Sequence, residues 1–422
     1  MIAQNNQQTR PYIYELDPLR AVTALTVIAV HVLAGTVGLN HTQTGLQVQN
    51  GLITSVHFTR EVFMFITALA LAYVYYARPF EASRFWAKRS IGVLLPYCIW
   101  SIAYTWVNTS QHSPGAFAKL ALFNILTGNA SYQLYYILLA IEFYLVLPLF
   151  LLILKHIQKH PWRALLISFA LQVLLMYVDY RYIQQGSLAS SGVWQIVAAY
   201  QDRFLLTYQF FFVLGGLAAL YLKQARAFVL SHDKWIVSGF VLALAAVWVH
   251  FLLQVDVSHD SFGYATSVLQ PIMEFYSPTV IVLLGFLACR WANTDIGRAH
   301  PKGYRFWHTL SDASFGIYLV HVFILTALLQ WVVPFMPEAW PVALRVFLTW
   351  FLTAGGAAGI SILLMKTPVL SHLVGRSAHW HSSKDANALH EWFSKTFLAA
   401  CLSEARTEFV GRLHKIMTFR HP

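Results

Sequence analysis

Residues 16–35 read LDPLRAVTALTVIAVHVLAG, an apolar run whose only ionisable side chains are those of Asp17, Arg20 and His31. An α-helix of about 20 apolar residues crosses roughly 30 Å of hydrocarbon, because each residue adds about 1.5 Å. Further apolar runs follow along the chain, with polar connections between them. The first run therefore predicts the pattern of the whole chain, which is a series of membrane-spanning helices.

The composition supports this interpretation. The chain has 422 residues, of which 57% are hydrophobic and 11% are charged, and its mean hydropathy is +0.54. A water-soluble protein of this size needs more polar surface. Cys98, Cys289 and Cys401 lie far apart, so we predict neither a disulfide framework nor a metal site. The net charge of +11 is dispersed between apolar runs, so we expect no nucleic-acid partner.

Ten transmembrane helices are expected. We place them at Pro18 to Leu39, Val56 to Ala77, Ser90 to Val107, Leu134 to Leu154, Ala164 to Asp179, Phe204 to Leu222, Trp235 to Gln254, Val268 to Cys289, Ala313 to Val333 and Val342 to Met365.

The basic residues predict the orientation of these helices. Cytoplasmic connections of membrane proteins carry an excess of Lys and Arg. With the N-terminus in the cytoplasm, all but five of the 29 Lys and Arg residues fall on the inner side, the five being Arg60, Lys119, Arg181, Arg203 and Arg345. The predicted fold is an all-α polytopic membrane helical bundle of about ten transmembrane helices, with both termini cytoplasmic.

Three regions follow from this topology. Residues 1–16 form a cytoplasmic N-terminal tail, 17–366 the transmembrane domain and 367–422 a cytoplasmic amphipathic tail. The polar start of the chain shows no cleavable signal peptide. Six apolar residues of the C-terminal tail recur near helical spacing and predict a helix that lies on the inner leaflet: Leu389, Trp392, Phe393, Phe397, Leu398 and Leu402.

The predicted outer connections suit neutral polar ligands. Asn40 to Thr59, Asn108 to Gln133 and Tyr180 to Arg203 are rich in Asn, Gln, Ser, Thr, Tyr and Trp and nearly free of Lys. Such a surface is suited to sugars. The alternative is that these are ordinary solvated loops.

The first helix places two functional candidates on one face. Arg20 and His31 are eleven residues apart, which is three helical turns plus about 20° and some 16 Å along the axis. An arginine at the cytoplasmic mouth is suited to binding phosphate, and a neutral imidazole near mid-membrane is suited to accepting a hydroxyl proton. The alternatives are an arginine that snorkels to the interface and a buried histidine that hydrogen-bonds to a neighbouring helix.

Other ionisable residues form the rest of the candidate site. Glu142, halfway along the fourth predicted helix, is a candidate to orient His31 or hold an acceptor hydroxyl; the alternative is an interhelical hydrogen bond. Arg60, Glu61 and Arg203 are candidate acceptor-binding residues on the outer side, and the alternative for this outer surface is interface anchoring.

Two other histidines are given no catalytic role. His308 and Asp312 have the HxxxD spacing of many soluble acyltransferases, but we place them in a cytoplasmic connection away from His31. His321, in the ninth predicted helix, is interpreted as structural.

Five segments, taken together and in order, resemble the acyltransferase 3 family of bacterial membrane O-acyltransferases, especially its exopolysaccharide- and adhesin-modifying members. The first is the Arg20 to His31 spacing, and the others are REVFMFITALAL (residues 60–71), FWAKRSIGVLLPYCIWS (85–101), YYILLAIEFYLVLPLF (135–150) and SFGIYLVH (314–321). The resemblance covers about residues 12–370.

This resemblance implies a function and a set of site residues. The family transfers an acyl group, usually acetyl from acetyl-CoA, to a hydroxyl of an extracytoplasmic or lipid-linked glycan. Acyl-CoA is thus the expected co-substrate, with no tightly bound cofactor. The family's Arg and His correspond to Arg20 and His31, and its third-helix basic motif to Arg89. The second arginine of that motif is Gly92 here, and Lys88 is a candidate replacement.

The resemblance also implies the setting of the protein. We expect a multi-pass protein of the bacterial cytoplasmic membrane, with the lipid bilayer, acyl-CoA and a glycan acceptor as partners; a homo-oligomer is left open. The rival interpretations are a glycan or lipid transporter without catalysis and a non-catalytic membrane scaffold.

Overall fold

The computed structural model describes residues 11–110, 113–184, 186, 188, 192–293 and 300–375. The amphipathic helix predicted around Leu389 to Leu402 lies outside these residues. Within them the chain is helical, with no β-strand.

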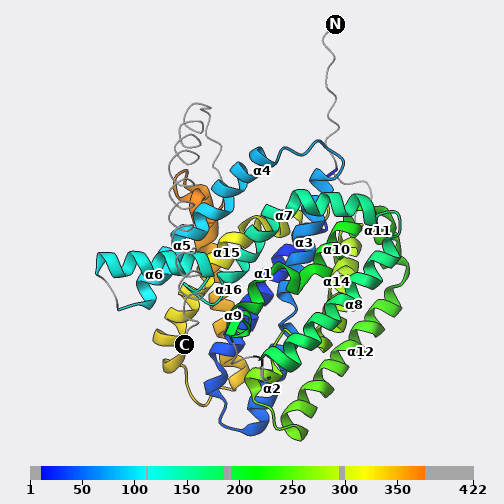
Figure 1. The fold of residues 1–422 in the computed structure, drawn as a ribbon. Helices are drawn as coiled ribbons and strands as arrows, with labels where there is room; N and C mark the ends of the chain where they lie inside the picture. The colour runs from blue at the N-terminus through cyan, green and yellow to red at the C-terminus, as the bar shows by residue number, and fades with distance from the viewer. Residues whose placement is uncertain are drawn as a thin grey trace, which may run out of the picture. The chain divides into compact units, whose positions relative to one another are not determined.

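The described chain forms sixteen α-helices, numbered in chain order, most of which are labelled in Figure 1. They are α1 (Leu16–Gly35), α2 (Gln43–Val56), α3 (Thr59–Tyr75), α4 (Ala82–Arg89), α5 (Leu95–Asn108), α6 (Pro114–Thr127), α7 (Tyr135–Ile157), α8 (Pro161–Val178), α9 (Gly192–Tyr200), α10 (Gln209–Leu220), α11 (Leu222–Ser231), α12 (Asp233–Leu252), α13 (Phe262–Ala265), α14 (Pro271–Ala292), α15 (Tyr304–Trp331) and α16 (Val342–Lys366).

The all-α multi-pass prediction is confirmed. Nine helical segments of the described chain are long and apolar enough to cross a membrane. A tenth arises if Gly192–Arg203 and Leu205–Leu220, which meet at a bend of 46°, count as one span. This bent pair contains most of the predicted sixth helix, Phe204 to Leu222. The cytoplasmic location of both termini stays a prediction.

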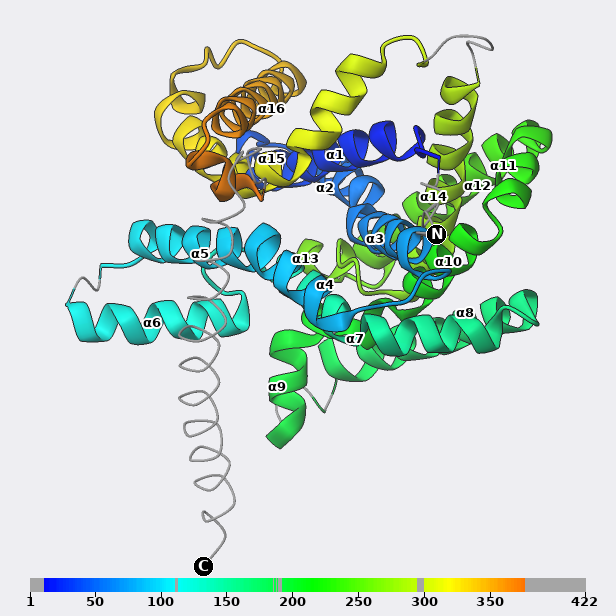
Figure 2. The ribbon, with the colours of Figure 1, turned by 90° about the horizontal axis from the view of Figure 1, so that it is seen from above.

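The connections predicted on the outer side contain helices that the sequence analysis missed. The polar segment after α1 forms α2, which begins where the Thr42 hydroxyl accepts a hydrogen bond from the backbone N–H of Gly45 at 3.1 Å. The next connection contains α6, which lies beside α5 as a helical hairpin (Figure 2). Helix α6 is apolar but has only 14 residues, which is too short for a span, and α2 continues into α3 within one candidate span, Gln43–Tyr75.

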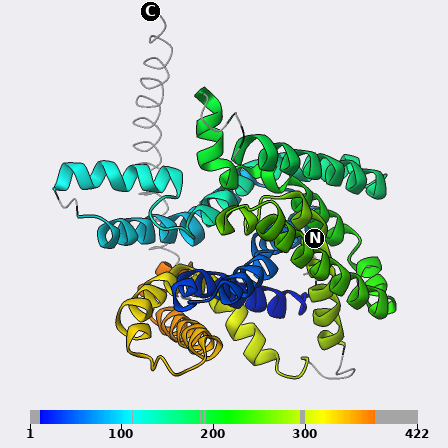
Figure 3. The same cartoon turned by 90° about the horizontal axis from the view of Figure 1, so that it is seen from below.

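Helix α1 lies between α3, α15 and α16 (Figure 3). Ile28 and Val32 of α1 are fully buried, and they pack with Ala313 and Ile317 of α15 and Ala357 of α16. Small side chains at such contacts let membrane helices approach closely. The helix that carries Arg20 and His31 is thereby fixed on one side, and its other side faces α3 and α7 across the cavities described below.

A second close contact joins α3 and α10, at Gly215. A Cβ atom at this position would overlap the backbone carbonyl oxygen of Phe65 in α3. Backbone atoms cannot move aside as a flexible side chain can, so the contact requires glycine.

We therefore expect Gly215→Ala to destabilise the protein by about 1–3 kcal/mol, the usual cost of overpacking. Gly239→Ala, in α12, is the matched control, because no atom lies within 4 Å of its Cβ position. This control should stabilise by about 0.5–1 kcal/mol, since alanine favours helix more than glycine does. Thermal unfolding in detergent measures both, and equal melting temperatures would contradict the packing argument.

Candidate active site

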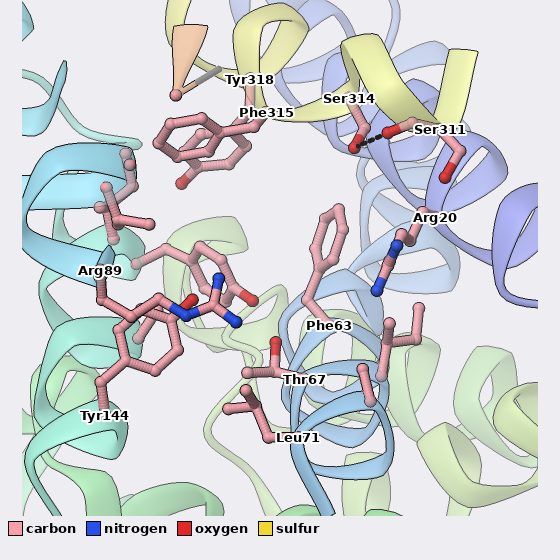
Figure 4. A pocket seen from close by; sticks show the side chains of 18 of the residues that line it. Arg20, Phe63, Thr67, Leu71, Arg89, Tyr144, Ser311, Ser314, Phe315 and Tyr318 are labelled. Atoms are coloured by element: carbon pink, nitrogen blue, oxygen red, sulfur yellow. Dashed lines mark hydrogen bonds between the residues drawn. The ribbon is translucent and has the colours of Figure 1, made fainter. Parts of the chain in front are cut away.

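The first cavity has a volume of about 410 Å³ and opens between α1, α3, α7, α15 and the segment that joins α4 to α5. Arg20 and Arg89 both line it, and Figure 4 shows their guanidinium groups pointing into it from opposite walls. The cavity is within the range of small-molecule sites, roughly 300–1,000 Å³. The structure therefore brings together two of the three residues predicted to bind the acyl donor.

A short π-helical segment positions Arg89. Residues Ser90–Leu94 form one wide turn between α4 and α5, and such insertions often occur at functional sites. The guanidinium of Arg89 lies over the ring of Tyr144, 5.0 Å from its centroid, and its buried Nε atom has no hydrogen-bond partner within the described chain. The aromatic face holds the cation without neutralising it.

Arg20 and Arg89 outnumber the one carboxylate, that of Asp312, among the described residues that line the cavity. In the part of the chain that the structure describes, neither guanidinium forms a salt bridge. Guanidinium groups without a carboxylate partner are suited to binding phosphate, whose oxygens they contact in pairs.

Lys88 does not join this group. Its side chain is exposed, and it is not among the residues that line the cavity.

Gly92, by contrast, does line the cavity, and its carbonyl oxygen lies against Gly375. The short helical turn Leu370–Val374 that precedes Gly375 packs against α5, α15 and α16, so this part of the predicted C-terminal tail belongs to the membrane-domain packing.

The HxxxD pair lies within a helix, not in a connection as the sequence analysis placed it. His308 and Asp312 occupy the first turns of α15. The Nδ1 atom of His308 is 3.3 Å from a carboxylate oxygen of Asp17, and its Nε2 atom is 3.5 Å from Asp312. His308 is 13 residues before His321 on α15, about 20 Å along the axis, so it lies away from the His31 site, whereas Asp312 lines the arginine cavity.

Tyr12 completes this polar cluster at the start of α1. Its hydroxyl donates a hydrogen bond to the Asp17 carboxylate at 2.9 Å. Burial and the neighbouring carboxylate of Asp17 raise the pKa of the Tyr12 hydroxyl, which therefore stays protonated. The cluster fixes the beginning of α1, one turn before Arg20.

The second cavity, of about 220 Å³, contains His31. It shares three lining residues with the first cavity, namely Phe63 of α3, Tyr136 of α7 and Tyr318 of α15. Because the same three rings line both spaces, the cavities adjoin along the interior of the bundle. Arg20 and His31 thus face two adjoining cavities with these three aromatic side chains between them, and we call the two cavities together the passage.

The His31 ring lies between two other rings. Tyr132 is 4.7 Å away between centroids, and His321 is stacked on it at 5.4 Å. The Nδ1 atom of His321 is 2.8 Å from the carbonyl oxygen of Tyr318. Since a carbonyl only accepts hydrogen bonds, this Nδ1 atom carries the proton and Nε2 is left as an acceptor. That Nε2 atom is buried without a partner in the described chain.

Of the three predicted acceptor-binding residues, only Arg60 lines the His31 cavity. Its guanidinium donates to the Tyr208 hydroxyl at 3.2 Å. Glu61 is 1% exposed and lines neither cavity. Arg203 donates to the side-chain oxygen of Asn129 at 2.7 Å and pairs with Asp202 at 3.4 Å, so it braces the loop behind the cavity instead of facing into it.

Glu142 is not brought to His31. Tyr135, Tyr136, Ile137, Ala140 and Tyr144 of α7 line the cavities, and Glu142 lines neither of them. The structure therefore does not bring Glu142 into the group of residues that surround His31.

Two residues of the His31 cavity were not singled out from the sequence. Tyr132 lies in a predicted connection, and His57 is in the second predicted helix but before its motif begins at Arg60. His321, interpreted as structural from the sequence, is stacked on the His31 ring, and it follows Tyr318 by three residues and so shares its face of α15.

A comparison with protein families now identifies the chain. A family model described as an acyltransferase domain matches residues 13–366. The chain belongs to the acyltransferase 3 family. The acyltransferase match runs from just before α1 to the last residue of α16, so it contains every α-helix that lines the cavities. Searches of curated proteins and of solved structures each found no match. The protein is thus a multi-pass membrane acyltransferase.

Proposed function

We propose that this acyltransferase uses cytoplasmic acyl-CoA, acetyl-CoA in particular, to acylate a hydroxyl of a glycan on the other side of the bacterial plasma membrane. The glycan is a component of the cell envelope, either a polysaccharide or its lipid-linked precursor. The single observation that carries the proposal is the passage in which the Arg20 and Arg89 cavity adjoins the His31 cavity.

The donor enters the first cavity. The phosphates of acyl-CoA bind the guanidinium groups of Arg20 and Arg89, which have no carboxylate partner in the described chain. The acylated arm then extends past Phe63, Tyr136 and Tyr318, and the thioester reaches the neighbourhood of His31. Arg20 and His31 are about 16 Å apart along α1, so the donor spans this distance with its flexible arm.

The chemical step is a direct transfer. An acceptor hydroxyl attacks the thioester carbonyl carbon while an imidazole nitrogen of His31 takes the hydroxyl proton. The C–O bond forms, the C–S bond breaks, and the CoA thiolate leaves and takes the proton from His31, which regenerates the neutral ring. The products are an O-acyl glycan and CoA.

Gln133 is a candidate to stabilise the oxyanion of this step. Its side chain lines the His31 cavity and is 1% exposed. Its Nε2 atom has no hydrogen-bond partner within the described chain, and its Oε1 atom accepts from Ser131 at 2.5 Å. A buried N–H donor that is already fixed in place stabilises developing charge without having to reorient.

The experiment that tests the function compares envelope polysaccharide from cells with and without the protein. We expect mass spectrometry to show an added acyl mass on the glycan, about 42 Da for acetyl. This added mass should disappear when the gene is deleted and return with the wild-type chain. Membranes that contain the protein should also release CoA from acetyl-CoA. An unchanged glycan together with altered glycan export would contradict the proposal and favour transport.

A further inference from the structure

A third cavity, of about 650 Å³, lies between α5, α6, α15 and the loop that joins α6 to α7. The three cavities follow one another along helix α15. Its residues from Ser311 to Tyr318 line the arginine cavity, Tyr318 also lines the His31 cavity, and its residues from Val322 to Trp331 line the third. The third cavity is therefore at the end of the passage remote from Arg20 and Arg89.

The described lining of this cavity combines apolar side chains with polar, uncharged ones. Among the residues that the structure describes, no Asp, Glu, Lys, Arg or His lines it. Amide and hydroxyl side chains supply the polar groups: Asn108, Asn124, Asn129, Gln330 and Thr326. A site for phosphate, carboxylate or a metal ion needs opposite charge. Amides and hydroxyls, which both donate and accept, match the hydroxyl groups of a neutral sugar.

Hydrogen bonds hold these amides in fixed positions. Asn124 donates to the Thr105 hydroxyl at 3.0 Å, and Asn108 donates to the carbonyl oxygen of Ala130 at 3.0 Å. Arg203 donates to Asn129 at 2.7 Å from behind the loop. Since these side chains are already fixed, little conformational entropy is lost when a ligand binds.

Aromatic rings supply the apolar faces that sugars also need. Tyr104 and Phe323 stack with their centroids 4.1 Å apart and form one wall. Trp331, at the end of α15, is 67% exposed. Broad rings beside polar groups are typical of small-molecule sites with amphipathic ligands.

Tyr132 connects this cavity to the catalytic one. Its side chain lines both cavities, is 54% exposed, and lies 4.7 Å from the His31 ring. The neighbouring Ser131 lines the third cavity and donates to Gln133 in the His31 cavity. Only the Tyr132 side chain thus stands between a ligand in the third cavity and the His31 cavity, where the hydroxyl reacts.

We propose that the third cavity is an acceptor subsite for an uncharged oligosaccharide. One sugar ring occupies the cavity between α5, α6 and α15, and the adjoining sugar residue presents its hydroxyl to His31 past Tyr132. The acceptor is accordingly a segment of at least two neutral sugar residues. This inference rests on the proposed function and adds the class of acceptor that the site selects.

Ala327→Trp tests the subsite by filling it. Ala327 lines the third cavity and is exposed, and it lines neither of the other two. Polysaccharide from cells that lack the protein is cut by mild acid into monosaccharide and oligosaccharide fragments, which serve as acceptors for the purified full-length chain with acetyl-CoA. We expect the KM for oligosaccharide to rise about tenfold, with the KM for acetyl-CoA and the kcat/KM for monosaccharide unchanged.

Ala118→Trp is the matched control, because Ala118 is exposed on α6 and lines none of the three cavities. Gln330→Ala is a milder second variant, with an expected rise of about threefold in the oligosaccharide KM; it decides the question if Ala327→Trp loses acetyl-CoA binding.

The subsite is refuted if Ala327→Trp and Ala118→Trp have the same oligosaccharide KM, or if only lipid-linked acceptors are affected, which would assign the cavity to a lipid chain. Failure of the wild-type chain to acylate any fragment would instead refute the proposed function.

Discussion

The His31→Ala variant is expected to lose acyl transfer almost completely, with kcat lowered by about 10²–10⁴-fold, the range for loss of a general base. His31 lines the second cavity, whereas Arg20 and Arg89 line the first. Donor binding should therefore persist, and the KM for acetyl-CoA should change by no more than about twofold. Steady-state CoA release by the purified protein with the glycan acceptor measures both constants.

His321→Ala distinguishes the base from its neighbour. His321 stacks on His31 but its Nδ1 atom is engaged by backbone carbonyls, so its expected role is to position the His31 ring and its loss should reduce kcat less. His41 is an exposed histidine outside the cavities, so His41→Ala serves as the control and should keep the wild-type kcat. A greater loss in His321→Ala than in His31→Ala would show that the base is assigned to the wrong ring.

Replacement of the two cavity arginines should act on the donor instead. We expect Arg20→Gln and Arg89→Gln each to raise the KM for acetyl-CoA by about 10–100-fold, since a hydrogen bond to a charged group contributes about 1.5–3 kcal/mol and each 1.4 kcal/mol is tenfold. Added salt should raise the KM for acetyl-CoA of the wild-type protein and have less effect on the variant that carries both Arg20→Gln and Arg89→Gln. Equilibrium binding of acetyl-CoA to detergent-solubilised protein gives the same comparison without turnover.

Lys88→Gln is the matched control for the arginines. Lys88 adjoins Arg89 in sequence, yet its side chain is exposed and outside the cavity. Its donor KM should stay within about twofold of wild type. If Lys88→Gln weakened donor binding as strongly as Arg89→Gln, the phosphates would bind at the surface and the first cavity would not be the donor site.

The sequence predicted the membrane helices and placed Arg20 and His31 on one face of the first helix, because both depend on local properties. Helix length follows from the apolar runs, and two residues eleven apart on α1 share a face whatever surrounds them. Helices α2 and α6 were not predicted. Helix α2 has a polar composition that resembles a solvated loop, and α6 is apolar but, at 14 residues, too short to cross a membrane.

The remaining site residues depend on how helices meet in space. Glu142 lines neither cavity, because the residues of α7 that reach the passage are set by how this helix packs against its neighbours. Tyr132 comes from a loop and reaches His31 through the path of the chain between α6 and α7. Such contacts between segments about a hundred residues apart leave no periodic signal in the sequence.

In the proposed mechanism, donor and acceptor enter one passage from opposite ends. Proteoliposomes test this directly if the protein is inserted in one orientation, acetyl-CoA is supplied only on the side of the Arg20 and Arg89 cavity, and the acceptor glycan is confined to the other side. We expect acylated glycan on the acceptor side and free CoA on the donor side, with neither in the His31→Ala variant. Transfer that occurs only when donor and acceptor share one side would contradict it.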